Sequence, residues 1–187
     1  MLDKLLFFLW VTAWSAGGWL LASSTFHLPR RLVFGVGLAL GAVMQVWLAN
    51  LLGFLLPATV AFWGGALLTL GLGIAFTWPL SLDKIRRAFI PTSWGQVLAL
   101  LFLTYIFTAI GRGLLLFEDY QNLPTISLMA TGDIPPRFAL DPNIRFGYHY
   151  LMLLFAAQVM RLGGIVPWNA LDLTRGLFFG LTILLTY

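Results

Sequence analysis

The chain contains no cysteine and few charged residues. Among its 187 residues, Asp, Glu, Lys and Arg make up 10%, whereas 60% are hydrophobic. The lack of cysteine excludes disulfides and thiolate chemistry. No charged residue occurs from Leu32 to Leu82. A water-soluble protein of this length has too little interior to bury so much apolar surface, so the composition predicts a membrane protein.

Long apolar runs predict the fold class. A bilayer core about 30 Å thick is crossed by a helix of about 20 apolar residues. Because the core offers no water to unpaired peptide groups, such spans must be helical. We therefore expect an all-α fold: a polytopic transmembrane helical bundle of about six spans with one outward loop of short helices. The expected spans are Leu5–Ala22, Leu32–Leu52, Pro57–Trp78, Trp94–Phe117, Tyr148–Leu162 and Asn169–Tyr187.

These spans divide the chain into three regions. Residues 1–117 form a four-span N-terminal region, residues 118–147 an extracytoplasmic loop, and residues 148–187 two further spans. The last run, Gly176–Tyr187, has no polar tail after it. We therefore expect the chain to be the N-terminal part of a longer protein.

The basic residues predict the orientation in the plasma (inner) membrane. The net charge of +4 would suggest a nucleic-acid partner in a soluble protein, but here the basic residues lie in short loops, where they orient helices. Three loops on one side carry seven of the eleven: Arg30, Arg31, Lys84, Arg86, Arg87, Arg161 and Arg175. That side is expected to be cytoplasmic, with the N-terminus and the 118–147 loop outside. The alternative of a cleaved signal peptide over residues 1–24 is disfavoured by Asp3.

An acidic pair follows the fourth expected span. Glu118 and Asp119 could mark the membrane interface, bind a divalent cation such as Mg²⁺ or Mn²⁺, or supply a general base toward a hydroxyl acceptor. Adjacent helical residues point about 100° apart, so both can serve one site only where the helix frays. We take both as candidate catalytic residues and as candidate metal ligands.

Arg112 lies within the fourth expected span, seven residues before Asp119. Two helical turns would place both residues on one face, about 10 Å apart along the axis. This spacing leaves room for a ligand with a phosphate at Arg112 and a hydroxyl near Asp119. An ionisable residue inside a span usually faces a cavity or the bundle interior. The alternative is an arginine that extends to the outer head groups.

Turn signals in the loop predict a folded cap. Gly132-Asp133 and Pro135-Pro136 are typical of turns between short helical pieces. His149, between Tyr148 and Tyr150, has no evident third metal ligand, and an interfacial aromatic belt explains the tyrosines.

Gly37 and Gly41 are better explained by close helix packing in lipid than by a nucleotide-binding fingerprint, because no strand precedes them.

Three segments carry a family resemblance: Phe117–Tyr120, Gly132–Pro136 and Phe146–Tyr150. They resemble polyprenyl-phosphate-dependent glycosyltransferases of the GT-C superfamily, and the last is similar to bacterial and archaeal membrane proteins named for a triple-tyrosine motif. The likeness covers about residues 110–187. It implies a lipid-linked sugar donor, with Asp119 or Glu118 as base or metal ligand. The substrate-binding residues would then be Arg112, Asp133, Tyr148, His149 and Tyr150.

Two other functions compete with the transferase. In one, the chain is a non-catalytic accessory subunit that packs with other membrane subunits through its aromatic surface. The other, a transporter, is disfavoured because the halves show no inverted repeat and Arg112 is the only charge expected at mid-membrane depth. The expected partners are membrane lipid, a polyprenyl-phosphate-linked sugar and other membrane subunits, without nucleic acid.

Overall fold

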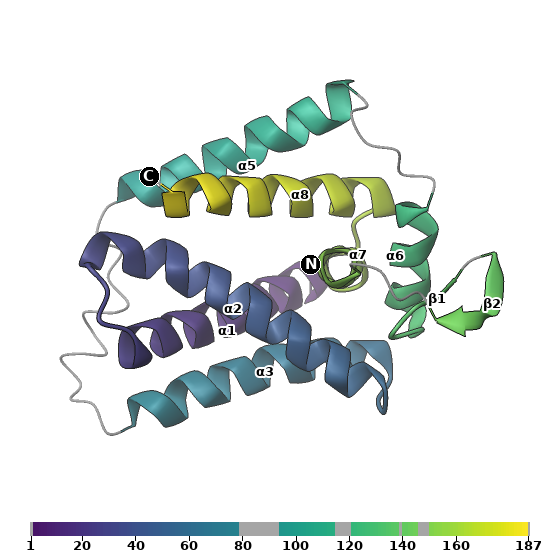
Figure 1. Cartoon of the computed structure of the whole chain (residues 1–187), viewed down its shortest axis with the longest axis horizontal. Coiled ribbons are helices and arrows are strands. Elements are labelled where there is room, and N and C mark those ends of the chain that lie inside the picture. Colours follow the sequence, from purple (N-terminus) through teal and green to yellow (C-terminus); the bar gives the residue numbers. More distant parts are fainter. Residues whose placement is uncertain (1, 79–93, 115–120, 139, 146–149, 187) are drawn as a thin grey trace.

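The computed structural model describes residues 2–78, 94–114, 121–138, 140–145 and 150–186. Within these ranges the chain is almost entirely helical, which confirms the all-α expectation (Figure 1). The helices are α1 (Leu2–Thr25), α2 (Arg30–Gly53), α3 (Ala58–Thr77), α5 (Trp94–Leu114), α6 (Asn122–Thr131), α7 (Leu151–Gly163) and α8 (Pro167–Thr186). Two short antiparallel strands, β1 (Arg137–Phe138) and β2 (Asp141–Arg145), form a hairpin.

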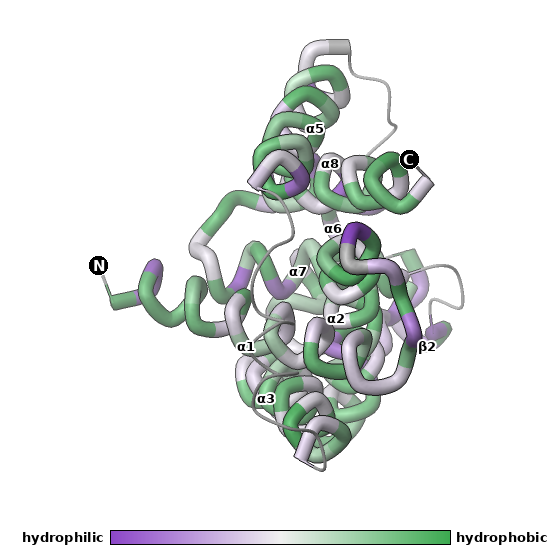
Figure 2. The backbone as a smooth tube through the Cα atoms, turned by 90° about the vertical axis from the view of Figure 1, so that its left-hand side faces the viewer, coloured by the Kyte–Doolittle hydropathy of each residue, from purple (hydrophilic) through white to green (hydrophobic). Residues whose placement is uncertain are grey.

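Four of the helices have the length and apolar composition of membrane spans, namely α1, α2, α3 and α5. Figure 2 shows that hydrophobic residues dominate these helices, whereas hydrophilic residues gather on the segment that leads to β2. Large apolar side chains such as Leu55, Trp78 and Trp94 are exposed on the outside. This surface is compatible with a multi-pass membrane protein whose outer solvent is lipid.

Helices α1, α2 and α3 form a three-helix bundle held at close distance by glycines. A Cβ atom on Gly18 would collide with the backbone of Gly37 and Gly41, and one on Gly41 with the carbonyl of Trp14. Gly17 in turn lies against the backbone of α3 at Thr69. Gly37 and Gly41 therefore serve close helix packing, as the sequence predicted.

Helices α5 and α8 form an antiparallel pair on the other side of the molecule (Figure 1). A Cβ atom on Gly176 of α8 would meet the Thr108 side chain and the Thr104 carbonyl of α5. The Thr108 hydroxyl donates a hydrogen bond to the Asp172 carbonyl at 3.3 Å. The pair meets the first bundle through Phe34 of α2, which packs with side chains of both helices.

Helix α7 lies between these two units and runs across them; Figure 1 views it nearly end-on while the long helices lie in the plane. Its residues Leu153–Val159 are buried. With 13 residues it is about 20 Å long, too short to cross a bilayer. It ends at Gly164, whose φ of 64° favours glycine. The expectation of six spans is therefore not confirmed, because an apolar run that packs inside the protein looks like one that faces lipid.

Two side-chain hydrogen bonds fix α7 to α2. The Tyr150 hydroxyl, just before α7, donates to Asn50 Oδ1 at 2.9 Å. Two turns further along, the fully buried amides of Gln45 and Gln158 pair at 2.7 Å. Because buried polar groups are costly without partners, these bonds select one position and direction for α7.

The position of α7 changes the charge count on which the orientation rested. Arg161 Nε lies 3.4 Å from Thr59 Oγ1 at the start of α3, and Arg175 is buried inside α8. Neither belongs with the loops at the other end of the bundle. Without these two, the seven basic residues of that side become five, and Arg161 raises the other side from four to five. The charge count therefore no longer favours one side, and the outward N-terminus stays a prediction.

Substitution of Gly18 tests the contact between α1 and α2. We expect Gly18→Ala to lower the free energy of unfolding by about 1–3 kcal/mol, because backbone atoms of Gly37 and Gly41 cannot yield to a methyl group. Gly71→Ala is the matched control, since a Cβ atom there meets nothing within 4 Å. Denaturant unfolding in micelles, followed by circular dichroism, measures both. Equal stability of the two variants would contradict the proposed contact.

Candidate functional site

A cap covers the end of the bundle where α5 ends and α8 begins (Figure 1). It consists of α6 and the β1–β2 hairpin, and α6 packs on α7 and α8. Ile126, Met129 and Ala130 form its buried face, and Ile134 lies against Gly53 at the end of α2. Gly132, with a φ of 123°, ends α6 at the predicted turn. The cap is therefore a packed element that contains the predicted short helix.

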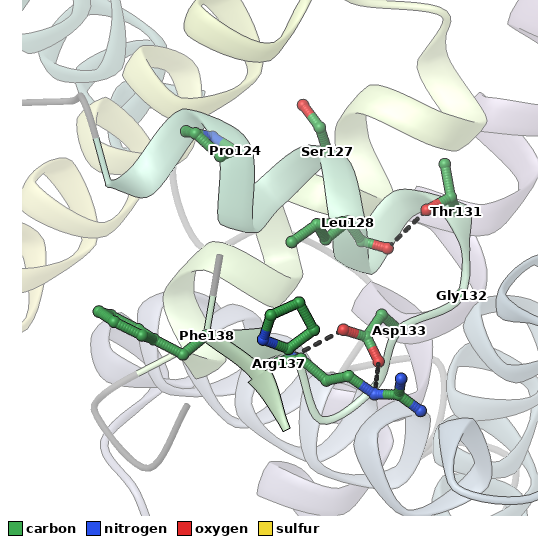
Figure 3. Close-up of a pocket in the computed structure, with 9 residues that line it drawn as sticks. Pro124, Ser127, Leu128, Thr131, Gly132, Asp133, Arg137 and Phe138 are labelled. Atoms are coloured by element: carbon green, nitrogen blue, oxygen red, sulfur yellow. Dashed lines mark hydrogen bonds and ion pairs between the residues drawn. The ribbon is translucent and has the colours of Figure 1, made fainter. Parts of the chain in front are cut away.

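A pocket of about 850 Å³ lies between the outer face of α6 and the hairpin (Figure 3). Its lining combines apolar side chains with two hydroxyls, a carboxylate and a guanidinium. The lining residues are Pro124, Ser127, Leu128, Thr131, Gly132, Asp133, Arg137, Phe138 and Pro142. Concave sites of this volume with a few convergent polar groups are typical of small-ligand binding.

Asp133 is the electrostatic centre of the pocket. Its Oδ2 accepts a hydrogen bond from the Arg137 backbone N–H at 2.7 Å. Its Oδ1 lies 3.5 Å from both Arg137 Nε and Arg145 Nη1. The Asp133 side chain is 23% exposed and each arginine 55%, so water screens these ion pairs and they add little stability. One carboxylate between two guanidiniums leaves an excess of positive charge.

Arg112 lies in the last turn of α5 and is exposed. Its Nη1 donates a hydrogen bond to Asn169 Oδ1 at the start of α8. The guanidinium is thus directed toward the neighbouring helix at the cap end of the bundle. It does not line the pocket of Asp133. Glu118 and Asp119, the predicted catalytic and metal-binding pair, lie outside the described residues, so the predicted hollow between Arg112 and Asp119 stays a prediction.

The tyrosine-rich segment is described only in part. Tyr150 is half-buried, and its hydroxyl is bonded to Asn50 of α2, outside the lining of the pocket. In this position it supports α7. Tyr148 and His149 lie outside the described residues, and their predicted role in substrate binding stays open. Of the five predicted substrate-binding residues, Asp133 is the one that the structure places in the pocket.

Metal binding remains a prediction. In the part of the chain that the structure describes, no three His, Asp or Glu residues gather into a group that could hold an ion. The predicted ligands of Mg²⁺ or Mn²⁺, Glu118 and Asp119, are not within that part.

A buried ion pair inside α8 was missed by the sequence analysis. Arg175 Nη1 lies 3.8 Å from Asp172 Oδ1, and both side chains are buried. Arg175 was counted with the connection between the last two expected spans, whereas the structure places it inside α8. The signal that could have found the pair is its spacing, because opposite charges three residues apart are neighbours on one helical face.

The two arginines beside Asp133 were also missed. Both follow Asp133 in sequence, but Arg145 reaches it only because the hairpin pairs Arg137 with Arg145. Hairpin register is difficult to predict for strands of two and five residues.

Comparison of the chain with protein-family models, with curated proteins and with solved structures finds no match in any of the three.

Removal of the Asp133 carboxylate tests its role in the cap. We expect Asp133→Ala to speed hydrogen exchange at the Arg137 amide by about threefold to tenfold, because that N–H loses its acceptor. Asp141→Ala is the matched control, since the Asp141 carboxylate accepts hydrogen bonds from Asn143. Exchange measured by mass spectrometry over residues 131–138 distinguishes them. Equal exchange in both variants would show that Asp133 does not organise the pocket.

Proposed function

We propose that the chain acts as an integral membrane glycosyltransferase-like protein, which takes a sugar from a lipid-phosphate donor at the cap end of the bundle. The observation that carries this proposal is the pocket at Asp133, which is lined by a carboxylate, a guanidinium, two hydroxyls and an aromatic ring. The likeness of three segments to GT-C glycosyltransferases supports the same reaction class.

The chemistry of the pocket suits a sugar phosphate. Ser127 and Thr131 offer hydroxyl oxygens that accept hydrogen bonds, because each hydroxyl donates its proton to a backbone carbonyl of α6. The Asp133 carboxylate also accepts from sugar hydroxyls. The Arg137 guanidinium offers several donors in a planar fork that matches phosphate. The Phe138 ring supplies an apolar wall for the C–H face of a sugar.

The place of the cap supports a donor that is anchored in the bilayer. The apolar helices α2 and α5 end beside the cap (Figure 1). A polyprenyl chain would lie along the exposed apolar surface of the α1–α3 bundle, and its phosphate and sugar would lie at the level of the cap. The apolar chain of the lipid-linked sugar would then lie in the bilayer, and its polar sugar phosphate would lie at the cap.

The same proposal includes the phosphate-binding and catalytic residues that the sequence predicts outside the pocket. Arg112, held at the cap end by Asn169, would contact the donor phosphate. Asp119 or Glu118 would act as general base toward the acceptor hydroxyl, or bind a divalent cation beside the phosphate.

Neutralising the arginine of the pocket tests donor binding. We expect Arg137→Gln to weaken binding of a fluorescent polyprenyl phosphate in nanodiscs by about tenfold, because a charge-assisted hydrogen bond to phosphate is lost. Arg161→Gln is the control, since Arg161 lies on α7 beside Thr59 and outside the pocket. Equal affinity of the two variants would refute the assignment of the pocket.

Asp119→Asn tests the chemical step. In the full-length protein we expect this variant to lose transfer from a radiolabelled polyprenyl-phosphate-linked sugar by about 10²–10⁴-fold, because the amide cannot accept the proton. Binding of the polyprenyl phosphate should be retained, which separates loss of catalysis from loss of folding. Asp141→Asn serves as the control carboxylate in the same loop. Unchanged turnover in Asp119→Asn would count against a base at this position.

A further inference from the structure

Helix α5 presents a broad apolar face that no other part of the described chain covers. Only 6% of its most apolar 18-residue window is buried, compared with 50% for α1, 44% for α2 and 33% for α3. Its packing partner is α8, and Figure 1 shows the pair at the edge of the molecule. The exposed face consists of Trp94, Leu98, Leu101, Phe102, Tyr105, Ala109, Ile110 and Gly113.

Tyr105 places a polar group in the middle of this face. It is 70% exposed and lies near the centre of the 21-residue helix. Among the described residues, none forms a hydrogen bond with its hydroxyl. Tyrosine is usually found at the membrane interfaces, where its hydroxyl reaches water, and an unpaired hydroxyl in hydrocarbon is costly. A polar partner at the same depth would remove this cost, and lipid tails cannot supply one.

Gly113 points to close contact with another helix. A Cβ atom on Gly113 would meet nothing within 4 Å, so packing within this chain does not require a glycine there. Gly18 and Gly176, by contrast, lie against backbone or side-chain atoms of their own chain. Ala109 lies one turn before Gly113 on the same exposed face. Two small residues at this spacing allow two transmembrane helices to approach closely.

We infer that the α5 face binds a second copy of this chain, with two α5 helices side by side about a twofold axis along the membrane normal. In such an interface each residue meets the same patch on its partner. Tyr105 is self-complementary, because a phenol both donates and accepts a hydrogen bond. The two hydroxyls can therefore satisfy one another at the centre of the interface.

The charges on α5 favour a second copy over a charged partner. The helix carries no acidic residue, and its one basic residue is Arg112. The Arg112 guanidinium is bonded to Asn169 of α8, so it is directed toward its own chain. The remaining exposed face carries no charge, so two copies of it can meet without repulsion.

Single-cysteine variants test this interface without background, because the chain has no cysteine of its own. We expect Ala109→Cys to form a disulfide-linked dimer on mild oxidation in proteoliposomes. Leu103→Cys is the control, since the Leu103 side chain faces Gly180 of α8. Equal cross-linking of the two variants would overturn the inference.

A second measurement uses two glycines in open positions. Energy transfer between labelled copies, followed as protein is diluted into lipid, reports the dimer dissociation constant. We expect Gly113→Leu to weaken the dimer about tenfold and Tyr105→Phe about threefold. Gly71→Leu, at an equally open position on α3, should leave the constant unchanged. If Gly113→Leu and Gly71→Leu dimerise alike, α5 is not the interface.

Discussion

The amide pair of Gln45 and Gln158 is the interaction on which the arrangement of the helices depends. It joins α2 to α7 at 2.7 Å between two fully buried side chains. In an apolar interior a lost amide hydrogen bond leaves two polar groups unsatisfied, so small displacements of α7 are strongly opposed. Helix α7 in turn contacts α1, α2, α3, α6 and α8. Helix α7 thus helps to place the cap and α8 relative to the N-terminal bundle, together with the contacts of Phe34 with the α5–α8 pair and of Ile134 with Gly53.

The position of α7 connects packing to the proposed chemistry. Because α7 runs across the bundle, it supports α6 from below, and the outer face of α6 is left to form the pocket. Apolar residues of α6 fix the helix on its buried side, while Ser127 and Thr131 on its other side line the pocket. The polar residues of the pocket are thus held in place by the apolar packing of α6, and a binding site requires such rigid support.

Much of the fold could be predicted from the sequence. The charge-free run from Leu32 to Leu82 predicted two helices and a tight turn, and α2 and α3 have these bounds within a few residues. Gly37 and Gly41 predicted close packing because only small residues allow two helix backbones to meet. Gly132 predicted the turn that ends α6 and positions Asp133.

The rest depends on contacts that periodicity does not encode. An apolar helix buried by other helices has the same composition as one that faces lipid, so the expected span Tyr148–Leu162, where the structure has the short buried helix α7, is not confirmed. Arg175 was counted among the basic residues of the connection before the last span, whereas its pairing with Asp172 allows it to lie buried inside α8. The environment of Asp133 depends on hairpin pairing, which brings Arg145 beside it.

The ion pair of α8 has a consequence for biosynthesis. With Asp172 and Arg175 in its first half, α8 is not among the helices apolar enough to enter a bilayer by composition alone. Insertion of an isolated α8 by a translocon would expose both charges to acyl chains. When α5 is already in place, α8 can enter against it, with Gly176 beside Thr104 and Thr108. The chain is therefore expected to integrate in order, with the earlier helix acting as the receiving surface for the later one.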